Sequence, residues 1–78
     1  MNLYILRQDT NNDYDTYDAC VVCAENPEEA IKISPSSNEW GYKYTSWAFK
    51  IEEVKCQLIG IADPSIEKGI VLASFNAG

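Results

Sequence analysis

The chain has 78 residues, a formal net charge of −6, and 46% hydrophobic and 12% aromatic residues. This length predicts a single domain over residues 1–78. The apolar content is that of a folded protein, which argues against intrinsic disorder. The excess of carboxylates disfavours direct binding of nucleic acid, and no apolar run reaches the length of a membrane span, so we expect a soluble, cytoplasmic protein.

Two apolar segments at the start of the chain predict two strands, over Asn2–Arg7 and Asp18–Ala24. Both carry apolar side chains on both faces, which predicts a sheet covered on both sides. Between them lies an acidic loop, residues 9–18 (D-T-N-N-D-Y-D-T-Y-D), with four aspartates and two tyrosines. Such a polar loop indicates either contact with a partner or a solvated surface.

A short helix is predicted next. Asn26 is a suitable N-cap, Pro27 suits the first helical position, and Glu29 stands where a capping box has its carboxylate. Ser34-Pro35 ends the helix after about two turns, too few for a helix that stands alone in water. We therefore expect it to lie on the sheet.

Aromatic side chains dominate residues 40–49, which contain Trp40, Tyr42, Tyr44, Trp47 and Phe49. One interpretation is that these rings cover the sheet face left bare by the helix. The other is that one or two of them line a ligand groove, because indole and phenol rings offer flat stacking surfaces.

The C-terminal third predicts two further strands, over Glu53–Ala62 and Ile70–Phe75, with a helical turn at Asp63-Pro64 that Gly69 can close. The order β-β-α-β-β predicts an α+β fold with a four-stranded, mainly antiparallel sheet and one short helix. The connections from strand one to two and from three to four suit hairpins. One helix leaves a face to be covered by the aromatic segment or by a second copy, which favours a homo-oligomer, most simply a dimer.

Catalysis and metal binding are not expected. The chain has no histidine, which removes the usual proton-transfer group, although a carboxylate pair of Asp13 and Asp15 remains conceivable. Cys20 and Cys23 have the spacing of zinc and redox sites, but residues three apart in a strand point to opposite faces. Asp9, Asn11 and Asp13 copy the start of an EF-hand loop, whose later positions do not follow. We predict a protein that is not an enzyme and has no cofactor.

Binding is the remaining class of function, and two modes are open. In the first, a small nucleotide-like ligand stacks on aromatic rings and bonds to polar groups, and the candidate residues are Arg7, Tyr14, Asp15, Tyr17, Trp40, Trp47 and Asn76. In the second, carboxylates pair with a basic host protein, and the candidates are Asp9, Asp13, Asp15, Asp18, Glu28 and Glu29. A solvated acidic surface without a partner is the third interpretation.

Several segments resemble a group of short proteins encoded by tailed phages and prophages. They are Tyr14–Asp18 (YDTYD), Val21-Val22, Ala24-Glu25, the helix start Pro27–Ala30 and the final Gly69–Gly78 (GIVLASFNAG). The resemblance implies a counter-defence factor that acts in the cytoplasm of a host cell. It would either sequester a nucleotide-derived immune signal or, as the alternative, clamp a basic defence or nucleic-acid-binding protein.

Overall fold

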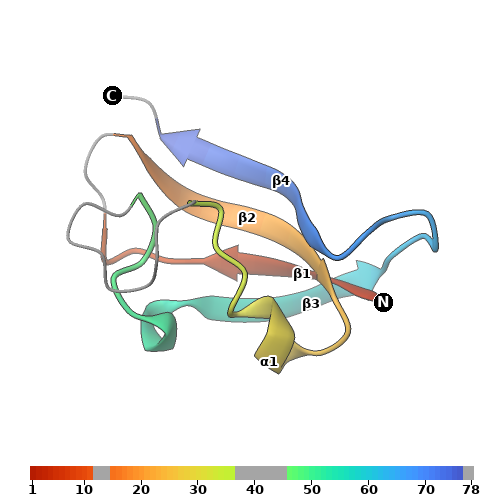
Figure 1. Cartoon of the computed structure of the whole chain (residues 1–78). Helices are drawn as coiled ribbons and strands as arrows, with labels where there is room; N and C mark the ends of the chain where they lie inside the picture. Colours follow the sequence, from red (N-terminus) through yellow and green to blue (C-terminus); the bar gives the residue numbers. More distant parts are fainter. Residues whose placement is uncertain (12–14, 37–45, 77–78) are drawn as a thin grey trace.

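The chain forms a four-stranded antiparallel sheet with one short helix on one face (Figure 1). The structure is a computed structural model that describes residues 1–11, 15–36 and 46–76. The elements in chain order are β1 (Asn2–Arg7), β2 (Thr16–Ala24), α1 (Pro27–Ala30), the 3-10 turn η1 (Ile51–Glu53), β3 (Lys55–Ile61) and β4 (Gly69–Asn76). The predicted α+β class and the order β-β-α-β-β are confirmed.

The hairpin of β1 and β2 forms the centre of the sheet. Its register pairs Asn2 with Ala24 and Arg7 with Ala19. Strand β1 has the predicted bounds, whereas β2 begins two residues before the predicted Asp18. The end of the acidic loop is therefore part of the sheet, because Thr16 and Tyr17 pair with the end of β4.

The predicted hairpin between the third and fourth strands is wrong. The sheet has the order β3-β1-β2-β4, so β3 and β4 lie at opposite edges (Figure 1). The connection of seven residues from Ala62 to Lys68 can span up to about 23 Å, and three strand spacings amount to about 14 Å. A connection of this length can cross the ends of β1 and β2, and β3 can thus pair with the free side of β1.

Helix α1 is shorter than predicted but begins as expected. The Asn26 side chain accepts a hydrogen bond from the Glu29 backbone N–H at 2.8 Å, and Pro27 is the first helical residue. The α-helix ends at Ala30, and two turn residues follow it. Ala30 is fully buried against the sheet, which explains how so short a helix is held in place.

The hydrophobic core lies on the α1 face of the sheet. It consists of Tyr4, Leu6, Cys20, Val22, Ala24, Ala30, Trp47 and Ala48. In the described part of the aromatic segment, Trp47 and Ala48 therefore lie on the same face of the sheet as the helix. For Trp47 this corrects both interpretations, since the ring neither covers the opposite face nor lines a groove. Trp40, Tyr42 and Tyr44 lie outside the described residues.

The opposite side of the sheet, which we call the open face, is less covered. By strand alternation and register it carries Leu3, Ile5, Arg7, Ala19, Val21, Cys23, Leu72 and Ser74. Of these residues, only Cys23 is fully buried. The β3–β4 connection covers it, and the Cys23 Sγ lies 3.8 Å from the carbonyl oxygen of Ile66 in that connection. Within the described residues, the open face is thus covered only at the end where the β3–β4 connection lies over Cys23. The expectation of a sheet covered on both sides is met at that end and not along the rest of the face.

Candidate functional site

The base of the acidic loop is organised by the side-chain amide of Gln8, which is almost completely buried. Its Nε2 donates to the Asn11 carbonyl oxygen at 3.0 Å and to the Tyr17 carbonyl oxygen at 2.8 Å. Its Oε1 accepts from the backbone N–H groups of Thr10 and Asn11 at 3.1 and 2.9 Å. One side chain thus satisfies backbone groups from both ends of the loop and holds these ends together.

A second buried amide fixes this loop to the rest of the fold. The Asn11 Nδ2 donates to the Trp47 carbonyl oxygen at 2.8 Å, and the Tyr17 N–H donates to the Ser46 carbonyl oxygen at 2.7 Å. Trp47 is itself a core residue. The loop therefore stands on a base that is connected to the hydrophobic core.

The three aspartates of the loop that the structure describes are all exposed to solvent: Asp9, Asp15 and Asp18. Asp9 lies 3.7 Å from the Lys55 ammonium, and both groups are so exposed that water screens their attraction. Asp15 adopts a left-handed backbone conformation with φ of 61°, which aspartate tolerates better than most residues do. Asp18 lies at a register shift between β2 and β4, where two β2 residues oppose one of β4. The candidate residue Asp13 lies outside the described residues.

Carboxylates also gather at the other end of the sheet, around the start of α1 and the β3–β4 connection. Glu28 is exposed, while Glu29 is partly buried and its Oε1 forms an ion pair with Lys68. This ion pair raises the pKa of the Lys68 ammonium. In the connection, hydrogen bonds from Ser65 lower the pKa of the Asp63 carboxyl. Both ends of the sheet thus present exposed carboxylates.

Of the described residues predicted to bind a ligand, Asp15, Tyr17 and Asn76 lie at one end of β2 and β4, whereas Trp47 lies in the core. Trp47 is 1% exposed and belongs to the core, so its ring presents no free face. The half-buried Tyr17 ring packs against Phe75 with a centroid separation of 4.7 Å and an interplanar angle of 47°. Arg7 is exposed on the open face, where it donates to Gln57 Oε1 at 3.5 Å. Asn76 pairs with Thr16 at the end of β4. Tyr14 and Trp40 lie outside the described residues.

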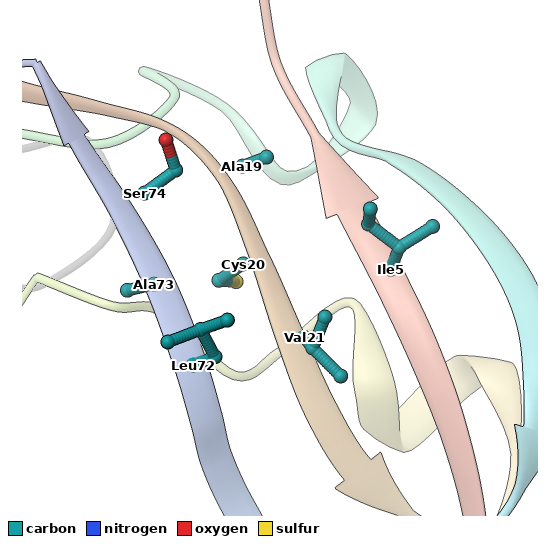
Figure 2. A pocket seen from close by; sticks show the side chains of 7 residues that line it. All are labelled: Ile5, Ala19, Cys20, Val21, Leu72, Ala73 and Ser74. Atoms are coloured by element: carbon teal, nitrogen blue, oxygen red, sulfur yellow. The ribbon is translucent and has the colours of Figure 1, made fainter.

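A hollow of about 370 Å³ lies between β1, β2 and β4 on the open face, and we call it the apolar hollow (Figure 2). Its lining residues are Ile5, Ala19, Cys20, Val21, Leu72, Ala73 and Ser74. Ser74 provides the lone polar side chain among them, and none of the predicted ligand-binding residues that the structure describes is in this lining. A lining of this kind suits apolar groups and lacks partners for ribose hydroxyls or phosphate.

The two cysteines of β2 lie on opposite faces, as strand geometry predicts. Cys20 belongs to the core, whereas Cys23 lies on the open face beneath the β3–β4 connection. Burial raises the pKa of the Cys20 thiol to about 12, so this sulfur is protonated at neutral pH and is a poor nucleophile. Among residues 1–11, 15–36 and 46–76, no group of three or more cysteine or acidic side chains is placed to hold a metal ion.

Comparison of the chain with protein-family models, curated protein sequences and solved structures finds no match. No helix in the described ranges is both long enough and apolar enough to cross a membrane.

Sequence reasoning missed the buried amides of Gln8 and Asn11 and the apolar hollow. In the sequence, Asn11 is distinguished only as a position of an EF-hand pattern, and Gln8 belongs to no motif. A glutamine and an asparagine on either side of a turn could have indicated capping of backbone groups. The hollow had no such local signal, because its residues come from three strands.

Proposed function

We propose that this protein is a non-catalytic binding protein whose acidic loop docks onto a basic surface of a partner protein. The observation that carries the proposal is the pair of buried amides, Gln8 and Asn11, which tie the ends of the loop to each other and to the core. A solvated surface without a partner needs no such support. A loop that is already ordered loses less conformational entropy on binding, which favours recognition.

The electrostatics support a basic partner. The net charge of −6 attracts cationic surfaces over distances of about 10 Å and accelerates their association. Exposed ion pairs each contribute only about 0–1 kcal/mol, so several carboxylates must act together. Asp9, Asp15 and Asp18 share one end of the sheet, and Glu28 and Glu29 lie at the other. The resemblance to phage proteins suggests that the partner is a host defence or nucleic-acid-binding protein, blocked by occupation of its basic surface.

Sequestration of a nucleotide-derived signal has less support. Trp47 is buried, Tyr17 packs on Phe75, and the hollow is lined almost entirely by apolar groups. A purine with its phosphates would therefore meet few polar partners in the described part of the chain.

Two experiments test the proposal. The tagged protein is first incubated with host lysate at low and at high ionic strength, and we expect it to retain a basic protein that is released as salt rises. A variant with Asp9→Asn, Asp15→Asn and Asp18→Asn should lose this partner. A control with Glu25→Gln, Glu52→Gln and Glu67→Gln removes the same number of carboxylates elsewhere and should keep it. Equal loss in both variants would indicate an effect of net charge without a defined site.

The second experiment is a thermal-shift assay with cyclic dinucleotides and ADP-ribose. Because a ligand that binds the folded state raises its apparent stability, sequestration predicts a higher midpoint temperature. We expect no change. A clear rise with one of these compounds, together with an empty pull-down at low salt, would overturn the protein-docking proposal in favour of a ligand store.

A further inference from the structure

The two edge strands of the sheet differ in how they are protected against pairing with another chain. Each edge strand is bulged once, because β3 has one unpaired residue between Leu58 and Gly60 and β4 has one between Ile70 and Leu72. Of the two, β3 also carries a charge at Lys55, and lysine residues are a common means by which edge strands avoid association. Strand β4 has neither charge nor proline over its eight residues, G-I-V-L-A-S-F-N.

Apolar side chains on both faces of β4 are exposed to solvent. Leu72, on the open face, is 69% exposed, and Ile70, Val71 and Phe75 are between 42% and 49% exposed. In the sheet order, β4 has β2 on one side and no strand on the other. Within the described residues, its outer edge therefore offers both backbone hydrogen-bonding groups and apolar side chains to a further strand.

The charge distribution indicates what that further strand is. Two copies of a chain with a net charge of −6 repel each other unless their contact surface is free of carboxylates. Strand β4 is the one strand of the four without a charged residue, since β1 contains Arg7, β2 contains Asp18 and β3 contains Lys55. A basic partner, by contrast, would gain most from the acidic ends of the sheet.

We propose that β4 pairs antiparallel with β4 of a second copy across a two-fold axis. The product is a continuous sheet of eight strands, and the same patch of each copy forms the contact, as two-fold symmetry requires. Leu72 lies both in β4 and in the lining of the apolar hollow (Figure 2). A two-fold axis perpendicular to the sheet places the hollows of the two copies on the same face of the joined sheet. Antiparallel pairing also places the acidic-loop end of one copy beside the α1 end of the other. This assembly does not depend on the proposed function.

Sedimentation equilibrium over a range of protein concentrations tests the assembly. The native protein should have twice the monomer mass of 8.8 kDa. Leu72→Lys places a charge on the exposed edge and should raise the dimer dissociation constant at least about tenfold. Leu58→Lys is the matched control, because Leu58 is 58% exposed on the other edge strand, and it should remain dimeric. Circular dichroism establishes that each variant is folded.

A second variant and a second measurement guard against misfolding of the first. Ser74→Lys changes an exposed polar residue of β4 without removing an apolar contact, and it should also weaken the dimer. Hydrogen exchange of the native protein should show protection of β4 amides that increases with protein concentration. A monomer at all concentrations, a dimer unaffected by both β4 variants, or concentration-dependent protection confined to β3 would each overturn the proposal.

Discussion

Replacement of Gln8 by alanine tests whether a buried amide holds the acidic loop. The substitution removes hydrogen bonds to four backbone groups, namely the N–H and C=O of Asn11, the N–H of Thr10 and the C=O of Tyr17. Thr10 is exposed, so water can replace the lost bond, whereas Asn11 is buried and loses two hydrogen bonds to the Gln8 amide. Each buried group without a partner costs about 1–3 kcal/mol. We expect a loss of about 2–4 kcal/mol in the free energy of unfolding.

Urea denaturation followed by circular dichroism measures this loss. With a denaturant dependence of about 1 kcal/mol per M for a domain of this size, the midpoint should fall by about 2–4 M or the variant should already be partly unfolded in water. The matched control is Gln57→Ala, which changes an exposed glutamine in β3 and should alter stability by less than about 0.5 kcal/mol. If Gln8→Ala costs no more than this control, the loop does not depend on the amide, and the argument for an ordered binding loop fails.

Three further predictions concern the core, the helix cap and the buried thiol. Trp47→Ala should lower the free energy of unfolding by about 3–5 kcal/mol, because Trp47 is the largest fully buried side chain among the described residues. Urea denaturation should then find little folded protein. A midpoint equal to that of the native protein would contradict the place of Trp47 in the core. Asn26→Ala should lower the free energy of unfolding by about 1 kcal/mol, because it removes the hydrogen bond from the Glu29 N–H. In thermal denaturation the midpoint should fall by about 4–8 °C. An unchanged midpoint would argue against a stabilising role of the cap. The pKa of the Cys20 thiol is raised in the folded state from 9.0 to about 12, so its contribution to stability is complete below pH 9 and is lost as the pH rises towards 12. Denaturation at pH 8, 9 and 10 should therefore show a steeper decline for the native protein than for Cys20→Ala, and parallel curves would contradict the predicted shift.

The candidate sites were predictable to different degrees. The exposure of Asp9, Asp15 and Glu28 follows from their polarity, and they lie in the predicted loop and helix start. Asp18 is also exposed, but it lies inside β2 and not at its predicted start. The burial of Trp47 did not follow, because an aromatic ring suits a core and a binding groove equally well. What decided between the two was its position under β1 and β2, which depends on residues more than 20 positions away.

Local signals by themselves determined the type and chain order of the four strands and of α1. The bounds of β1 follow from an apolar run ended by polar residues, and the start of α1 follows from Asn26 and Pro27, because periodicity and capping involve neighbours in the chain. The tertiary structure decided which strands are neighbours. Every strand edge offers the same backbone donors and acceptors. No local residue pattern therefore indicates that β3 pairs with β1 and not with β4. That choice depends on the length of the connection and on packing of the whole sheet, and it leaves the uncharged β4 at the edge.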